Sequence, residues 1–317
     1  MHWKKLGKIF DPTEHKLANG CIEYAQSPQA LVFDDFVRIY FSTRYPDKPG
    51  YFMSHISYVE MDKSFSKVLN VSSKRVIDLG KVGCFDEHGI FPLNIVKDKD
   101  KILGYIGGWS RKVSVSIETS IGLAISTDNG LTFQRIGDGP VLTSSLHEPF
   151  LIGDPFVAIF DNTYHMWYIY GIRWINHSDD RDPQRVYKIG HAYSKDGISW
   201  QKTGEQIIPD MLNPDECQAL PTVIKHKGMY HMYFCYRAAI GFRKISSKGY
   251  RIGYAYSNDL HNWVRDDANV GIDVSKDGWD SEMLCYPHIF LCDDKVLMMY
   301  NGNQFGRYGF GLAVLED

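Results

Sequence analysis

The sequence contains no apolar run that approaches the roughly 18–20 residues of a membrane-spanning helix. Its first residues, MHWKKLGKIFDPTEHK, lack the apolar core of a signal peptide. Neither sign of charge dominates, because 35 basic residues stand against 38 acidic ones. A nearly balanced charge gives no sign of nucleic-acid or membrane-surface binding. We therefore expect a soluble, cytoplasmic protein whose partner is neither nucleic acid nor a membrane.

Cysteine is present, but it lacks the close paired spacing of a zinc site. We expect free, buried thiols, because unpaired cysteines are commonly buried. The alternative is a metal site that uses Cys217, Cys285, His88 or His288, although no ligand spacing supports it. We therefore expect neither a metal nor a cofactor. The six cysteines lie mostly just before or inside apolar runs: Cys21, Cys84, Cys217, Cys235, Cys285 and Cys292.

One pattern occurs five times: a short apolar run after a proline, a polar turn, and a second run rich in aromatic residues. The copy DECQALPTVIKHKGMYHMYFCYR, residues 215–237, is typical. Successive prolines are 64, 63, 66 and 66 residues apart. A period this regular indicates an internal repeat. The five prolines are Pro28, Pro92, Pro155, Pro221 and Pro287.

A second pattern follows three of the hairpins: IGLAISTDNGLTFQRI from Ile121, IGHAYSKDGISWQKTG from Ile189 and IGYAYSNDLHNWVRDD from Ile252. Each copy has an alternating strand, a Ser-x-Asp turn and an aromatic residue that opens a fourth strand. Four antiparallel strands per unit are typical of a β-propeller blade. We therefore predict an all-β fold, a five-bladed β-propeller that forms a single domain over residues 1–317.

The two ends of the chain each resemble part of one repeat. The last residues, YGFGLAVLED, match a third strand and then stop, whereas HWKKLGKIFDP at the start resembles a fourth strand. Trp3 falls where other copies have Phe133, Trp200 and Trp263. We predict that the N-terminal strand completes the last blade and closes the ring, which removes exposed sheet edges.

In this geometry the first strand of each hairpin starts at one face of the disc, and the second strand returns to it. Residues at these two positions are expected to converge on one mouth, a central funnel. Before the prolines they are Glu23, Asp86, Glu87, Asp154, Asp215, Glu216 and Glu282. At the ends of the second strands they are Arg44, Trp109, Arg173, Trp174, Arg237, Asn301 and Asn303.

Two segments carry a resemblance to a known superfamily. GDPFVAIFDNTYHMWYIYG, from residue 153, and ECQALP, from residue 216, resemble blades three and four of the five-bladed propeller glycoside hydrolases, namely families 43 and 62, 32 and 68, and 130. The resemblance implies that Asp154 orients and tunes its partner and that Glu216 is the general acid. The sequence departs from the pattern in that Glu216 lies five residues before its proline instead of two. Ser27 also stands where families 43 and 32 have a base or nucleophile aspartate.

Hydrolysis of a glycosidic bond needs one protonated carboxyl and one ionised carboxylate. We expect Glu216, crowded by Asp215 and Asp154, to have a raised pKa, and Glu87 to replace the missing base. The other candidates would bind substrate through sugar hydroxyls, stacking on aromatic rings, or charge. They are Glu23, Arg44, Trp109, Arg173, Trp174, Arg237, Glu282 and Asn301.

The arginines leave two alternatives open. Arg44, Arg173 and Arg237 could neutralise the ring of acids, or they could recognise an anionic substrate, because arginine binds carboxylate and phosphate groups in a bidentate manner. Three functions remain: a glycoside hydrolase acting on an oligosaccharide or a glycan intermediate, a phosphorylase or glycosyltransferase on the same fold, and a glycan-binding propeller without chemistry. The oligomeric state is not indicated by the sequence.

Overall fold

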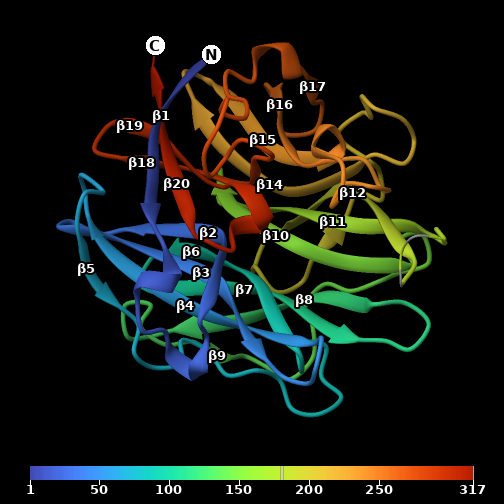
Figure 1. The fold of residues 1–317 in the computed structure, drawn as a ribbon, viewed down its shortest axis with the longest axis horizontal. Helices are drawn as coiled ribbons and strands as arrows, with labels where there is room; N and C mark the ends of the chain where they lie inside the picture. The colour runs from blue at the N-terminus through green and yellow to red at the C-terminus, as the bar shows by residue number, and fades with distance from the viewer. Residues whose placement is uncertain (179, 181, 317) are drawn as a thin grey trace.

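The computed structural model describes residues 1–178, 180 and 182–316, and it is all-β (Figure 1). Besides strands, the described residues form one short α-helix, α1 (Asn303–Gly306), and several single-turn 3₁₀ helices. None of the helices in these residues is long and apolar enough to span a bilayer. The single-turn 3₁₀ helices are η1 (Pro12–Glu14), η2 (Ala18–Gly20), η3 (Ser246–Lys248) and η4 (Asp267–Asn269).

Each predicted repeat corresponds to a set of four antiparallel strands. The third repeat forms a sheet of β10 (Phe150–Phe160), β11 (Thr163–Ile175), β12 (Gln184–Ser194) and β13 (Gln201–Lys202). The fourth forms a sheet of β14 (Cys217–His226), β15 (Met229–Arg237), β16 (Arg251–Ser257) and β17 (Val264–Arg265).

The first two repeats belong to one eight-stranded sheet. A single parallel bridge between Ser54 and Gly89 joins their two halves. The first half contains β2 (Glu23–Val32), β3 (Phe36–Pro46), β4 (Phe52–Asp62) and β5 (Val68–Val71). The second half contains β6 (Gly89–Asp98), β7 (Lys101–Arg111), β8 (Ile117–Ser126) and β9 (Gln134–Arg135).

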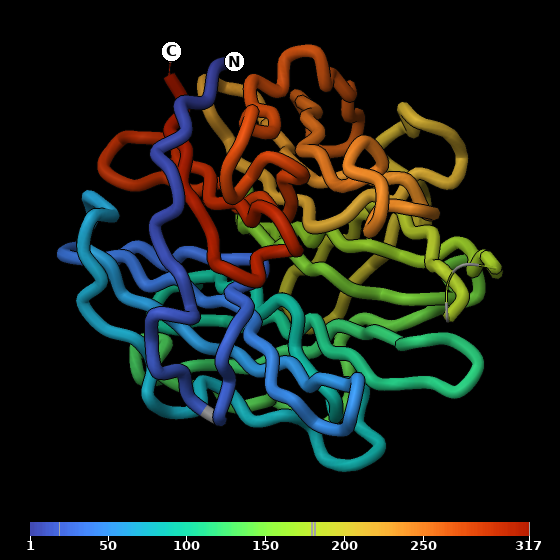
Figure 2. Tube along the Cα trace, in the orientation of Figure 1, coloured from blue at the N-terminus to red at the C-terminus, as the bar shows by residue number. Residues whose placement is uncertain are grey.

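The two chain ends lie side by side in the remaining sheet (Figure 2). Its order is β1-β20-β19-β18, so the N-terminal strand pairs with the C-terminal one, as the sequence predicts. Its strands are β1 (His2–Phe10), β18 (Cys285–Cys292), β19 (Lys295–Asn301) and β20 (Phe310–Glu316).

The aromatic residue that opens each fourth strand packs against the preceding repeat. Ring centroids are 5.4 Å apart for Trp3 and Tyr233, and the Trp3 indole nitrogen also donates a hydrogen bond to the Tyr233 hydroxyl at 3.2 Å. Trp3 is 3% exposed, so it occupies the repeat position that the sequence assigns to it. The equivalent ring pairs are Phe133 with Tyr40, Trp200 with Tyr105, and Trp263 with Trp167.

The first strands of the five repeats, β2, β6, β10, β14 and β18, are the innermost ones. Each contacts the next, and β18 contacts β2. Asn301 of β19 connects the last repeat to the first, because its side chain donates to Ala25 O and accepts from Ser27 N, both at 2.8 Å. The labels of β2, β6, β10 and β14 accordingly lie near the centre of Figure 1.

Every innermost strand contains a register shift at its proline. Proline is tolerated in a strand where a bulge leaves its position without a ladder hydrogen bond. In four of these strands the residue before the proline has a left-handed φ between 46° and 58°. Such bulges redirect a side chain out of the regular alternation. The four residues are Ser27, Asp154, Leu220 and Tyr286.

Candidate functional site

A cavity of about 470 Å³ lies where the inner strands begin and the second strands end. Its wall includes Phe91, Asp154 and Tyr286, which are the residues before three of the five bulge prolines. Asp154 is the acidic member of that set. Side chains from the other strands and loops that complete the wall include Gln26, Arg44, Ser54, Trp109, Ile117, Thr119, Leu151, Asp180, Asp182, Arg185, Tyr187, Arg243 and Tyr250.

Asp154 has the chemistry that a general acid or base needs near neutral pH. Burial raises the pKa of this carboxyl to about 7, although the Arg185 charge and the Leu220 backbone oppose the shift. Its φ of 50° is unusual for a residue other than glycine. Backbone strain of this kind persists where the surrounding structure holds it, often at functional sites. The bulge therefore holds a titratable carboxyl in the cavity wall.

Three arginines line the cavity beside its three aspartates. Among residues 1–178, 180 and 182–316, no carboxylate forms an ion pair with Arg44, Arg185 or Arg243. Arg44 donates to the Gln26 side chain at 3.1 Å. Burial lowers the pKa of Arg44, and the neighbouring Arg185 charge lowers it further. These guanidinium groups therefore form no ion pair with the described residues, although the Arg185 charge acts on the Asp154 carboxyl and the Glu23 charge acts on Arg44.

Arg237 contacts residues that line the cavity but does not line it itself. It is 2% exposed, lies outside the cavity lining, and donates to the Tyr187 hydroxyl at 2.9 Å. Its guanidinium carbon lies 3.6 Å from the Phe242 ring centroid. Tyr187 in turn shares a 2.7 Å hydrogen bond with Tyr250, and both line the cavity. The prediction that Arg237 faces the mouth is wrong, because these contacts hold its buried side chain behind the residues that line the cavity.

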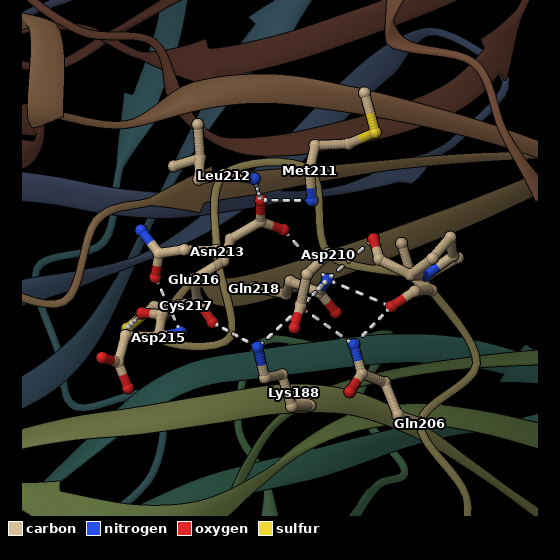
Figure 3. Close-up of polar contacts among 12 residues, drawn as sticks. Lys188, Gln206, Asp210, Met211, Leu212, Asn213, Asp215, Glu216, Cys217 and Gln218 are labelled. Atoms are coloured by element: carbon tan, nitrogen blue, oxygen red, sulfur yellow. Dashed lines mark hydrogen bonds and ion pairs between the residues drawn. The ribbon is translucent and has the colours of Figure 1, made fainter.

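Glu216 is fully buried and does not line the cavity, and polar contacts with neighbouring residues hold its carboxylate (Figure 3). One carboxylate oxygen accepts from the backbone N–H groups of Met211 and Leu212, at 3.0 and 2.9 Å. The other accepts from Gln218 and Arg265. Burial alone would raise the pKa of Glu216, but these hydrogen bonds and the Arg265 charge lower it below the usual value. The expectation of a raised pKa at a shared mouth is therefore wrong.

Other acids expected at the mouth are also occupied elsewhere. Asp86 is buried against Arg135, and the exposed Asp215 pairs with Arg173. Glu23 accepts from Arg307 at 2.7 Å. None of these residues lines the cavity, so the predicted convergence of carboxylates on one mouth is wrong for them. Each instead balances a nearby arginine.

The remaining candidates divide between the cavity and its surroundings. Arg44 and Trp109 line it, as the sequence predicts. Glu87 lies outside it, accepting from Gly83 N at 2.8 Å, and Glu282 is exposed outside it. Asn301 is buried between the last and first repeats, so its placement at the mouth is wrong. Trp174 lines a neighbouring hollow.

Sequence reasoning missed Arg185, Tyr187, Tyr250 and Arg243. The signal was available for Arg185 and Tyr187, because a third strand starts at the face where the second strand ends. Trp174 of β11 pairs with Arg185 of β12 in this way. Arg243 lies in the long connection between β15 and β16, where no strand pattern predicts a direction.

Comparison with known proteins gives one clear relationship by sequence. No known family profile matches the chain. The Mycobacterium tuberculosis proteins Rv1502, of strain H37Rv, and MT1551, of strain CDC 1551, are each 34% identical to it over 323 residues, which covers 100% of both chains. The chain belongs to this family. Both mycobacterial members are described as uncharacterized.

Solved structures share the family's fold. A glycoside hydrolase superposes with a TM-score of 0.74 and 16% identity, covering 99% of this chain and 93% of its own. A thermostable family 43 glycoside hydrolase gives 0.66 and 16%, covering 95% and 94%. A family 43 enzyme from Xanthomonas citri, solved with xylose, gives 0.60 and 14%, covering 99% and 90%. The predicted resemblance to these glycoside hydrolases is thus confirmed at the level of the fold.

In the part of the chain that the structure describes, no group of three or more His, Cys, Asp or Glu residues is placed to hold a metal ion. The cysteines there are unpaired, and five of the six are buried. The polar groups that line the cavity include carboxylates, guanidinium groups, tyrosine hydroxyls, and glutamine, serine and threonine side chains.

Asp154→Asn should alter how stability depends on pH. In the wild type the folded pKa of about 7 exceeds the ordinary value of 3.8, so the folded state holds this proton more tightly. The protonated carboxyl therefore contributes to the free energy of unfolding. This contribution is fully present below pH 3.8 and is lost as the pH rises to about 7. The variant should therefore lose less stability between pH 5 and pH 8, by roughly 2–4 kcal/mol.

Urea unfolding at the two pH values measures this difference. Asp215→Asn is the matched control, because Asp215 is exposed and paired with Arg173. The same pH dependence in wild type and Asp154→Asn would show that Asp154 has no raised pKa.

Proposed function

We propose that the protein is a glycoside hydrolase that acts on an anionic oligosaccharide or glycan intermediate bound in this cavity. The observation that carries the proposal is the combination of Asp154, whose pKa is about 7, with three guanidinium groups that have no carboxylate partner among the described residues. A propeller fold shared with glycoside hydrolases supports the class of reaction.

Asp154 would serve as the group that exchanges a proton with the substrate. At neutral pH both its protonated and ionised forms are populated, which suits general acid or base catalysis. Hydrolysis also needs a second carboxyl. Asp180 and Asp182, in the connection between β11 and β12, line the cavity and are the available partners. Glu216 is unsuited because its oxygens are already occupied.

The guanidinium groups would select the charge of the substrate. Arg44, Arg185 and Arg243 line one cavity from three different segments, so they can surround a single anion. A carboxylate of a uronic or nonulosonic acid, or a phosphate ester, offers the planar or tetrahedral oxygens that arginine binds. The ring of Trp109 would contact the apolar face of a sugar.

The same arginines favour a second candidate, phosphorolysis or glycosyl transfer. Inorganic phosphate held by the guanidinium groups would attack in place of water, and the reaction would then need one carboxyl only. Ser27, where families 43 and 32 have an aspartate, fits that scheme equally.

A panel of aryl glycosides and oligosaccharides, neutral and anionic, assayed with and without phosphate, tests the proposal. Turnover of anionic members in phosphate-free buffer supports hydrolysis. Strict dependence on phosphate or on a sugar donor would favour the second candidate. Saturable binding without turnover of any member would reduce the protein to a glycan-binding propeller.

Arg185→Ala should weaken binding of glucuronic acid or inorganic phosphate by roughly 1.5–3 kcal/mol, because one charge-assisted hydrogen bond is lost. Arg173→Ala is the matched control, since Arg173 pairs with Asp215 outside the cavity. Isothermal titration calorimetry measures both variants. Equal affinity in wild type and Arg185→Ala would remove the anion site from the proposal.

We also infer five blades in one domain. The lone bridge between Ser54 and Gly89 is a weak link between two otherwise complete four-stranded units. The continuous contacts among the five innermost strands, including β18 with β2, support a ring closed by β1.

A further inference from the structure

A second hollow, of about 380 Å³, adjoins the cavity and differs from it in chemistry. Its wall comes from the connection between β7 and β8, the start of β10 and the end of β11. Val113, at the tip of that connection, is fully exposed, and Phe150 is 38% exposed. The apolar part of the wall comprises Val113, Val115, Ile117, Pro149, Phe150 and Trp174.

The hollow adjoins the cavity, because Ile117 and Leu151 line both. Leu151 has a left-handed φ of 39°, at a register shift between β10 and β11. Its side chain therefore belongs to the boundary between a charged chamber and an apolar one. Among the described residues, the charged side chains of the hollow are Lys112 and Glu118, and they form an ion pair with each other.

We propose that this hollow binds an apolar aglycone of the same substrate whose anionic sugar occupies the cavity. The inference rests on the proposed function and narrows its substrate to an anionic glycoside with an aromatic or alkyl aglycone. Binding of that group would remove Val113, Phe150 and Trp174 from water, and this burial of apolar surface would favour binding. The shared residues Ile117 and Leu151 place the two chambers next to each other, so a single molecule could extend from one into the other.

The probes separate the two parts of such a substrate. Inorganic phosphate and glucuronic acid test the anion site alone. Phenyl phosphate and hexyl phosphate, with phenyl and hexyl glucuronide, add an aromatic or an alkyl group. Calorimetry gives the dissociation constants of each parent anion and its derivative. Their ratio measures how much affinity the apolar group gains by binding in the hollow.

We expect at least one derivative to bind about tenfold more tightly than its parent, since each buried methylene contributes up to about fourfold in affinity. Trp174→Ala should abolish most of that gain and leave the affinity for the parent anion unchanged. Val113→Ser should reduce the gain about threefold. Val82→Ser is the matched control, because Val82 is equally exposed and lies outside the hollow.

Several results would overturn the inference. One is the absence of any gain from either apolar group, and another is a gain that Trp174→Ala leaves intact. A third is that the protein forms a dimer, and that Val113→Ser dissociates this dimer without changing the ratio of dissociation constants. This result would mean that the hollow binds a second copy of the chain. The anion site is judged separately: if the derivatives bind through Trp174 while Arg185→Ala has no effect, the proposed function fails and the apolar site remains.

Discussion

Asp154→Asn is expected to lower kcat/KM by about 10²–10⁴-fold, which is the usual contribution of general acid or base catalysis. Asparagine keeps the shape of the side chain but neither gives nor takes a proton. The wild-type pH profile should show a limb near pH 7, because burial raises the pKa of Asp154 to about that value. The limb should disappear in the variant. The measurement is kcat/KM from pH 5 to pH 9, on the best substrate of the glycoside panel.

Two controls isolate the role of Asp154. Glu216→Gln should reduce kcat/KM far less, because Glu216 does not line the cavity. An aryl glycoside with an activated leaving group should be less affected by Asp154→Asn if Asp154 delivers the proton to that group. A variant that keeps full activity with an unchanged pH profile would exclude Asp154 from catalysis.

Arg265→Leu is expected to destabilise the protein by roughly 3–5 kcal/mol, because it leaves the carboxylate of Glu216 buried without its charged partner. Both side chains are at most 1% exposed. The double variant Glu216→Gln with Arg265→Leu should recover part of the loss, since it removes the buried charge as well. Urea unfolding at pH 7 gives the free energies.

Arg173→Leu is the comparison, because its partner Asp215 is exposed and such pairs contribute about 1 kcal/mol or less.

The stability of this ion pair should also depend on pH. Because the pKa of Glu216 is lowered in the folded state, its contribution to the free energy of unfolding is present above the ordinary value of 4.5 and is lost as pH falls through the folded pKa. Wild type and Arg265→Leu should therefore converge in stability on acidification. A cost below about 1 kcal/mol at pH 7 would contradict the assignment of a buried ion pair.

The repeat pattern of the sequence predicted most of the fold. Prolines 63–66 residues apart mark the innermost strands, and the aromatic residue after each Ser-x-Asp turn marks the fourth. Trp3 was therefore recognisable as part of the last repeat although it lies at the other end of the chain. Periodicity is sufficient here because each unit buries the same positions against its neighbour.

The sequence alone also identified Asp154, Arg44 and Trp109 as residues of a mouth, and it determined that acids and arginines occur at the strand ends. It did not determine which of the acids lines the cavity and which is held in hydrogen bonds and ion pairs elsewhere. Glu216 and Asp154 both precede a proline of an inner strand, but Asp154 lies at the bulge next to its proline and lines the cavity, whereas Glu216 does not. Four residues further back, Glu216 meets Arg265 of β17 and two backbone N–H groups. Those partners come from other segments, so only the tertiary structure decided that the pKa of Glu216 falls while burial raises that of Asp154.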